Sequence, residues 1–184
     1  MAKLISKTYA DALFELAIEE NKIDCLMDEA ISVKRIFEVN VELSNLLNHP
    51  QVMKEEKIEV VENVFSAKIS KEFLGFILIV IEKDRFKEFT SILDYFIDSV
   101  KEYKKIGVAY VTTAISLNAI TQVEIMEKLV KTTKYDSMEM NFIVDEGIIG
   151  GMIIRIKDRV VDTSIATKLT NLKMDLQKIQ LQVI

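Results

Sequence analysis

Several residue types are scarce in this sequence of 184 residues, which has one cysteine, one proline, one histidine, five glycines and no tryptophan. A single cysteine cannot form an intramolecular disulfide and fits a reducing compartment. So few glycines and prolines favour helices over loops. The longest apolar run covers residues 73–81, whereas a membrane-spanning helix needs about 20 residues. The composition therefore predicts a mostly helical chain that does not cross a bilayer.

Basic side chains are also in deficit, and only in one part of the chain. Residues 1–105 carry 15 Lys or Arg and 20 Asp or Glu, whereas residues 106–184 carry nine of each. The formal net charge of −5 therefore belongs to the first part. A chain that binds DNA or RNA through its surface charge needs a basic patch. We therefore expect no nucleic-acid partner.

Motifs for chemistry are missing as well. His49 lies beside Pro50 in a predicted turn, with no Ser, Cys or Asp partner marked by a motif. Cys25 stands at a predicted helix start, where its pKa could fall, but a buried small hydrophobe is the favoured interpretation. Gly147, Gly150 and Gly151 match neither the phosphate loop nor the dinucleotide fingerprint. We therefore predict no catalytic residue, no cofactor site and no metal site.

What the sequence does contain, up to residue 105, is helical periodicity. Apolar residues recur at three- and four-residue spacing, and Pro50 interrupts the pattern once. Ser70 is a candidate N-cap. Short connections between such helices are typical of a bundle. We predict six helices, covering residues 6–20, 24–37, 41–47, 53–65, 71–83 and from about 84 to 105.

Gly107 marks a change of pattern. Residues 108–114 and 138–144 have the composition or alternation of strands, residues 117–134 return to a helical period, and residues 152–156 alternate again. Residues 157–159 predict a turn, and Thr163 or Ser164 could cap a last helix over residues 164–182. The predicted fold is mostly α, with an N-terminal helical bundle over residues 1–105 and a small α+β domain over residues 106–184.

Two predicted helices carry more apolar surface than one core requires. On a helical wheel, the apolar arc of the first helix spans about 160°, whereas about 100° is enough to face a core. The fifth helix is apolar almost all round. Such a helix is either central in its bundle or faces a partner. The pairing of these two helices makes a groove for a foreign helix plausible.

The last predicted helix has a narrower pattern. Ile165, Leu169, Leu172, Leu176, Ile179 and Val183 follow an unbroken four-three repeat, as in a coiled coil. This seam could pack on the chain's own sheet or continue beyond it to meet a partner helix. Just before it, Gly150 and Gly151 can adopt backbone angles closed to other residues, or let another chain approach closely.

Four segments in order resemble the delta subunit family of F-type ATP synthases, called the oligomycin-sensitivity-conferring protein in mitochondria. Residues 9–17 (YADALFELA) resemble the opening helix of the family, and residues 46–50 (LLNHP) the end of its third helix. Residues 73–86 resemble its fifth-helix stretch, although the family often has a small residue followed by Arg-Leu there. Residues 149–164 resemble its C-terminal signature.

The resemblance implies a stator subunit without a catalytic site of its own. In the family, a six-helix bundle binds the N-terminal helix of an alpha subunit in a groove between helices one and five, and the smaller domain binds the b helices of the peripheral stalk. We assign to the alpha-subunit groove Ile5, Tyr9, Ala12, Leu16, Phe73, Phe76, Ile77 and Val80. We assign to the stalk contact Gly150, Gly151, Arg155, Leu176, Ile179 and Val183.

The resemblance further implies a chain that is not a homo-oligomer and is held peripherally at a membrane through its complex. That membrane face is the cytoplasmic side of a bacterial inner membrane, or the stromal side of a thylakoid if the chain is plastid-encoded. Two other classes stay open at this point: an unrelated helical adaptor and a small enzyme. Co-purification with other partners would favour the adaptor, and a bound cofactor or turnover would favour the enzyme.

Overall fold

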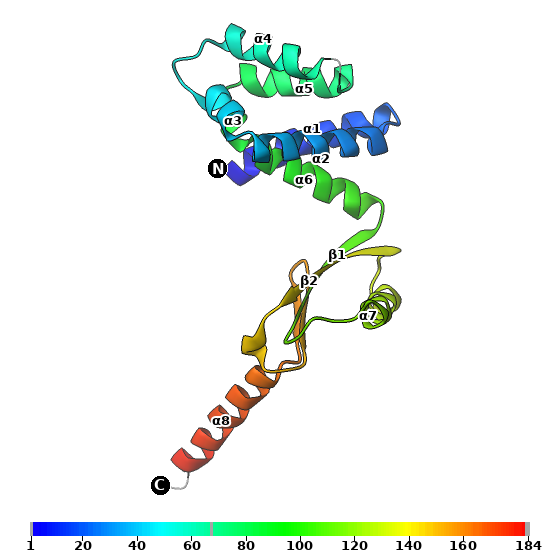
Figure 1. The fold of residues 1–184 in the computed structure, drawn as a ribbon, viewed down its shortest axis with the longest axis vertical. Coiled ribbons are helices and arrows are strands. Elements are labelled where there is room, and N and C mark those ends of the chain that lie inside the picture. Colours follow the sequence, from blue (N-terminus) through cyan, green and yellow to red (C-terminus); the bar gives the residue numbers. More distant parts are fainter. Residues whose placement is uncertain (1, 67, 183–184) are drawn as a thin grey trace. The chain divides into compact units, whose positions relative to one another are not determined.

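The computed structural model describes residues 2–66 and 68–182. The chain forms two compact units, Met1–Tyr103 and Lys104–Ile184, each with its own elements (Figure 1). The division falls two residues before the boundary that the change of periodicity predicts. The two units are described separately below.

The N-terminal unit consists of helices joined by short turns. Their periodic apolar residues, with Pro50 between the third and fourth, fix their extents to within a few residues of the predicted ranges. The unit contains α1 (Ala2–Glu19), α2 (Ile23–Val39), α3 (Val41–Asn48), α4 (Lys54–Phe65), α5 (Lys71–Glu82), the 3₁₀ turn η1 (Phe86–Glu88) and α6 (Phe89–Tyr103).

One cluster of buried apolar side chains, drawn from all six of these helices, forms the core of the unit. The three- and four-residue spacing on α6 buries Phe89, Leu93, Phe96 and Val100, as the periodicity predicts. Phe37 of α2 lies at the centre of an aromatic group, and its ring centroid is 5.8 Å from Phe65, 5.3 Å from Phe86 and 5.5 Å from Phe89. Such rings stabilise a core by their buried area and by edge-to-face contacts.

The C-terminal unit is a four-stranded sheet with helices. Its elements are β1 (Ile106–Thr113), α7 (Ala119–Thr132), β2 (Ser137–Val144), the 3₁₀ turn η2 (Glu146–Ile148), β3 (Met152–Ile156), β4 (Arg159–Asp162) and α8 (Ile165–Gln182). The strand order is β2-β1-β3-β4. The β1 and β2 strands are parallel and joined through α7, whereas β3 pairs antiparallel with both β1 and β4. The mostly helical fold with an α+β C-terminal part is therefore confirmed.

Among the described residues, the buried cluster of this unit lies on one face of the sheet. Ala109, Tyr135 and Met138 are buried there, with Met126, Leu129 and Val130 of α7 packed against them. A Cβ on Gly107 would collide with Met138 Sδ and lie 2.7 Å from a Tyr135 ring carbon, which is closer than Cβ atoms come in real structures. Gly107 is therefore required by packing at the start of β1.

Among the described residues, no helix is both long enough and apolar enough to span a membrane.

Candidate protein-binding surfaces

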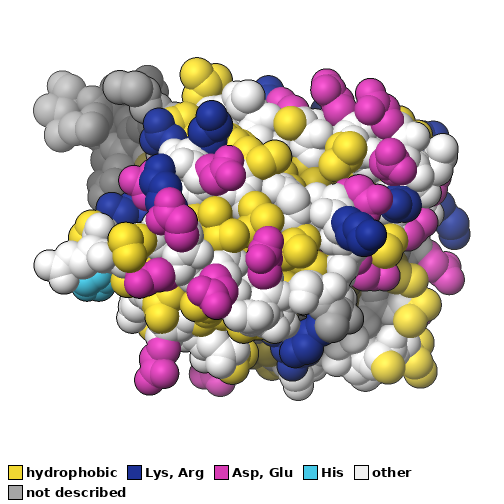
Figure 2. Space-filling model, turned by 90° about the horizontal axis from the view of Figure 1, so that it is seen from above, with side chains coloured by type: hydrophobic (Ala, Val, Ile, Leu, Met, Phe, Trp, Pro, Cys, Tyr) yellow, Lys and Arg dark blue, Asp and Glu magenta, His cyan; other side chains and the backbone are white. Residues whose placement is uncertain are grey.

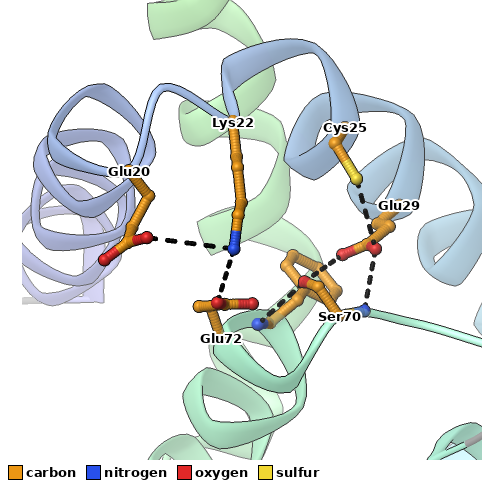
Figure 3. Close-up of polar contacts among 7 residues, drawn as sticks. Glu20, Lys22, Cys25, Glu29, Ser70 and Glu72 are labelled. Atoms are coloured by element: carbon orange, nitrogen blue, oxygen red, sulfur yellow. Dashed lines mark hydrogen bonds and ion pairs between the residues drawn. The ribbon is translucent and has the colours of Figure 1, made fainter.

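A set of polar contacts fixes the start of α5 against α1 and α2 (Figure 3). Ser70 donates two hydrogen bonds to Glu29 of α2, from its backbone N–H at 2.8 Å and from its hydroxyl at 2.7 Å. The same hydroxyl accepts from the N–H of Phe73 at 3.3 Å and so caps α5, as the sequence predicts. Glu29 and Ser70 thereby hold one end of α5 beside α2.

The turn between α1 and α2 adds an ion pair to this set. The Lys22 ammonium donates to Glu72 in the first turn of α5 at 2.6 Å and lies 3.8 Å from Glu20 (Figure 3). The hydrogen bond to Glu72 raises the pKa of Lys22, and the reciprocal bond lowers the pKa of Glu72. The turn that follows α1 therefore lies beside the N-terminal end of α5, so the two helices with excess apolar surface are neighbours at that end.

The four groove residues predicted on α1 do share one accessible stripe. Ile5, Tyr9, Ala12 and Leu16 are spaced by four, three and four residues and therefore project from the same side of the helix. Ala12 is exposed and the other three are half-buried, with Tyr9 and Leu16 packed partly against the core. This stripe leaves apolar surface on α1 for another molecule.

The four groove residues predicted on α5 point into the core of the bundle instead of toward its surface. Phe73, Ile77 and Val80 are fully buried in the bundle core, and Phe76 is nearly so. These side chains therefore offer almost no accessible surface to a foreign helix. This side of α5 matches the alternative from the sequence analysis, in which the helix is central in its bundle. Because α5 is apolar on every side, its periodicity could not show which side faces inward.

The accessible side of α5 consists of residues that the sequence analysis did not single out. Leu74 and Leu78 are half-buried, Gly75 lies between them, and Ile79 is 49% exposed. Figure 2 shows hydrophobic side chains exposed at the surface, interspersed with acidic and basic ones. Elsewhere on this unit, a hollow is lined by apolar and polar side chains together: Ile36, Val39, Asn40, Val41, Glu42, Leu43, Val64 and Lys68.

In the C-terminal unit, the two predicted contact glycines serve the chain's own packing. A Cβ on Gly151, whose φ is +77°, would lie 2.5 Å from the backbone oxygen of Thr163. A Cβ on Gly150 would lie 2.8 Å from the Ile165 side chain. The close approach that these glycines permit is therefore between η2, β3 and the start of α8.

The residue before these glycines has a strained backbone. Ile149 has φ 66° and ψ −38°, and the N–H of Gly150 donates to the carbonyl of Ile148 at 2.7 Å. This is close to the γ-turn geometry that is rare even for unbranched residues. The N–H of Ile165 donates to the carbonyl of Gly150 at 3.0 Å, which couples the turn to α8.

The start of α8 is held by Asp162 and Ser164. Asp162 accepts from the N–H of Ser164 and from the hydroxyl of Thr167, both at 2.8 Å, and Ser164 accepts from the N–H of Thr167 at 3.2 Å. Ser164 is thus the cap, one of the two candidates from the sequence. The hydrogen bonds from Ser164 and then Thr167 lower the pKa of Asp162.

Beyond this cap, the predicted apolar seam of α8 is open. Leu169, Leu172 and Leu176 are 54%, 59% and 64% exposed, and Ile165 is partly exposed as well. The first part of α8 contacts η2, at the glycine turn. Of the two remaining seam residues, Val183 and the side chain of Ile179 lie outside the described residues.

The sheet face opposite the core is open too and includes Arg155. This exposed residue on β3 pairs with Tyr110 on β1 and with Val160 on β4, and the three form one row across the strands. Tyr110 and Val160 are both exposed. The alternation of β1 reveals this face, but no motif in the sequence singles out Tyr110 or Val160.

The structure brings no reactive groups together at His49 or Cys25. His49 is exposed, and its Nδ1 accepts from the backbone N–H of Gln51 at 3.3 Å. Cys25 is exposed rather than buried, which corrects the interpretation from sequence, because it faces Glu29 instead of the core. Partial desolvation and the Glu29 carboxylate raise the pKa of its thiol, which makes it less reactive. Within residues 2–66 and 68–182, no group of three acidic, histidine or cysteine side chains could hold a metal.

Relatives among known proteins cover almost the whole chain. A delta subunit of ATP synthase from Lachnoclostridium phytofermentans is 50% identical over 181 residues, which is 98% of this chain and 100% of that protein. The delta subunit from Desulforamulus reducens is 33% identical, over 92% of this chain and 93% of that protein. A chloroplastic delta subunit from Guillardia theta is 31% identical, over 94% of both.

A solved structure shares the fold of this chain. A chain in the mitochondrial ATP synthase hexamer of Toxoplasma gondii superimposes with a TM-score of 0.76 over 94% of this chain and 97% of its own length, at 18% identity. The family described as ATP synthase delta (OSCP) subunit matches residues 5–176. By the extent of that match and by its relatives, the chain belongs to the ATP synthase delta (OSCP) family.

Proposed function

We propose that this chain, a non-catalytic stator subunit of an F-type ATP synthase, binds its two partners with separate units. The N-terminal unit would bind the N-terminal helix of an alpha subunit, and the C-terminal unit would bind the b subunits of the peripheral stalk. The observation that carries the proposal is that each unit has its own accessible apolar surface, one along α1 and α5 and the other along α8.

On the N-terminal unit, the proposed contact combines Ile5, Tyr9, Ala12 and Leu16 of α1 with the outward side of α5. Large apolar side chains in such a site contribute roughly 1.5–3 kcal/mol each when fully buried, as an upper estimate. An amphipathic helix that presents residues at i, i+3, i+4 and i+7 is suited to cover two such stripes. Ile77 and Val80 take part indirectly, because they hold α5 in place from beneath.

On the C-terminal unit, the proposed stalk contact includes the seam of α8 and the open sheet face with Arg155. Gly150 and Gly151 contribute by setting the position where α8 begins. The seam residues Leu176, Ile179 and Val183 remain part of this proposal. Held at both ends in this way, the chain would keep the catalytic head from turning with the rotor, so that rotor torque drives ATP synthesis.

This arrangement would place the chain peripherally at a membrane, held there by its complex. The chain's charge suits a protein partner, since residues 1–105 have an excess of acidic side chains and residues 106–184 have equal numbers of basic and acidic ones. For a bacterial host we propose the cytoplasmic face of the inner membrane, and for a plastid host the stromal face of the thylakoid.

A two-sided capture experiment tests the proposal with the full chain as bait. The alpha–beta head and a soluble b-subunit fragment would be offered separately. The double variant Leu78→Asp/Ile79→Asp should bind the head at least tenfold more weakly and bind b with unchanged affinity. Leu172→Asp should bind b at least tenfold more weakly and bind the head with unchanged affinity. Ile31→Asp on α2 and Val123→Asp on α7 are the controls, since both side chains are partly exposed and apolar but lie on other helices.

Two results would contradict the proposal. If the wild-type chain retains neither the head nor b, the two proposed contacts are wrong. If each variant loses both partners while its circular dichroism is unchanged, the two contacts are not carried by separate units.

A further inference from the structure

The four-three repeat of α8 assigns its neighbouring residues to the flanks of the seam. With Leu169 and Leu176 at a positions and Ile165 and Leu172 at d positions, the flanking e and g positions hold Ala166, Lys168, Lys173 and Asp175. The two lysines lie on opposite flanks, Lys168 at g and Lys173 at e. The described part of the flanks therefore carries a net positive charge, unlike the chain as a whole, which is acidic.

This flank charge disfavours a second copy of the chain as the occupant of the seam. In a parallel two-stranded coiled coil, a g residue faces the e residue five positions further along the other helix. Lys168 of one copy would then face Lys173 of the other, and the same repulsion would occur twice by symmetry. Like charges at these positions select against pairing.

From the exposed seam and its flanks we infer that α8 is one strand of a two-helix coiled coil whose other strand is an acidic-flanked helix. The partner would have its own apolar a and d seam, with Glu or Asp at the e and g positions that face Lys168 and Lys173. This inference rests on the proposed stalk contact and specifies its chemistry. The apolar seam supplies the affinity, and the lysines select the partner and its register.

The open geometry supports this assignment. The seam leucines are more than half exposed, and Ser164, the residue before α8, is buried beside the glycine turn. Lys168 and Lys173 are exposed. Lysine stems can cover part of an apolar seam while the ammonium group stays in water, which is why lysines suit such positions.

Two designed helical peptides provide the test. Both carry Ile at a and Leu at d over four heptads, and one has Glu and the other Lys at every e and g position. Each repels itself, so both remain available to bind the full chain. The Glu peptide should bind at least tenfold more tightly at low salt. The difference should shrink as salt increases, because the Debye length is only about 10 Å at 0.1 M.

Variants make the result specific to α8. Lys168→Glu/Lys173→Glu should reverse the preference, whereas Lys87→Glu/Lys128→Glu, an equal charge change at exposed sites outside α8, should leave it unchanged. Leu172→Asp should lose both peptides. A preference that the α8 lysine variant does not change would overturn the inference, and so would failure to bind either peptide.

The self-association state and the b fragment complete the test. Analytical ultracentrifugation should show that the full chain is monomeric. A dimer that dissociates in the Leu172→Asp variant would instead assign the seam to a second copy of the chain. If the Glu peptide is not preferred but b is still lost on Leu172→Asp, the proposed stalk contact stands and the acidic flank is wrong. If Leu172→Asp still retains b, the proposed contact at α8 is wrong.

Discussion

Single side chains decide where the helices that carry the two surfaces begin. Ser70 both caps α5 and ties it to Glu29, so removing its hydroxyl breaks two hydrogen bonds. Ser70→Ala should lower the free energy of unfolding of the N-terminal unit by about 1 kcal/mol. Denaturant titration followed by circular dichroism measures this, with Ser91→Ala on the exposed side of α6 as the control. Equal stability of Ser70→Ala and wild type would show that Glu29 and water replace the cap.

Two glycines allow a matched test of backbone geometry. Gly151 has a positive φ and a backbone oxygen where its Cβ would lie, whereas Gly75 is inside α5 with no atom within 4 Å of its Cβ position. Gly151→Ala should therefore destabilise the C-terminal unit by at least about 1 kcal/mol. Gly75→Ala should stabilise α5 by roughly 0.5–1 kcal/mol, because alanine is the better helix former. Thermal melting of both variants measures this, and the same sign for both would refute the geometry.

Asp162 gives the C-terminal unit an expected pH dependence. Hydrogen bonds to Ser164 and Thr167 lower its pKa below the ordinary value of 3.8. A carboxylate with a lowered folded-state pKa stabilises the fold above its unfolded pKa, and the stabilisation is lost as pH falls through the folded pKa. Asp162→Asn should therefore flatten the decline in stability below about pH 4. Asp158→Asn, in the exposed turn before β4, should leave the decline unchanged, and an unchanged decline in Asp162→Asn would contradict the assignment.

At the scale of elements, α5 separates folding from binding by the direction of its side chains. Ile77 is fully buried, whereas Ile79 is about half exposed two residues further along. Ile77→Asp would bury an unpaired charge and should unfold the bundle or cost several kcal/mol. Ile79→Asp should change the free energy of unfolding by less than about 1 kcal/mol. Chemical denaturation of both distinguishes them, and comparable destabilisation would mean that Ile79 is also part of the core.

The elements also differ in how far the sequence could predict them. On α6, Phe89, Leu93 and Phe96 stand out from polar neighbours, so periodicity identified the buried side correctly. On α5, polar residues do not mark a surface, and Ile77 faces inward because the helix packs into the bundle core on that side. The sequence was also ambiguous at Cys25, because a residue at a helix start next to Leu26 can face the core or the solvent. In the structure it faces Glu29.

The C-terminal elements show the same limit for contacts between distant residues. The glycines of residues 150 and 151 indicated a close approach, but which chain approaches depends on Thr163 and Ile165, which follow an intervening hairpin. The seam of α8 was readable as a pattern from Ile165 onward. Whether it lies on the sheet or away from it depends on the direction of the helix after Ser164, which no local pattern encodes.

At the scale of the whole molecule, the two units differ in how much core each one has. The N-terminal unit buries side chains from all six helices in one cluster, including Phe65, Phe73 and Phe96. The C-terminal unit has fewer buried apolar side chains among its described residues: Ala109, Val111, Ile125, Tyr135, Met138 and Ile148. A small core leaves little margin against conformational entropy. Binding of a partner along α8 would therefore add to the stability of the C-terminal unit as well as join it to another subunit.

The N-terminal unit should fold without the rest of the chain. Its core cluster contains only residues before residue 104, and the Lys22–Glu72 and Ser70–Glu29 contacts also lie inside it. Residues 1–105, expressed alone, should therefore give a helical protein that melts cooperatively, with a midpoint close to that of the first unit in the full chain. Circular dichroism and calorimetry measure this, with the destabilised variant Ile77→Asp of the same fragment as the control. A fragment that binds a hydrophobic dye and melts without a cooperative transition would show that residues 106–184 contribute to the bundle, and the two contacts proposed for the stator would then depend on one another.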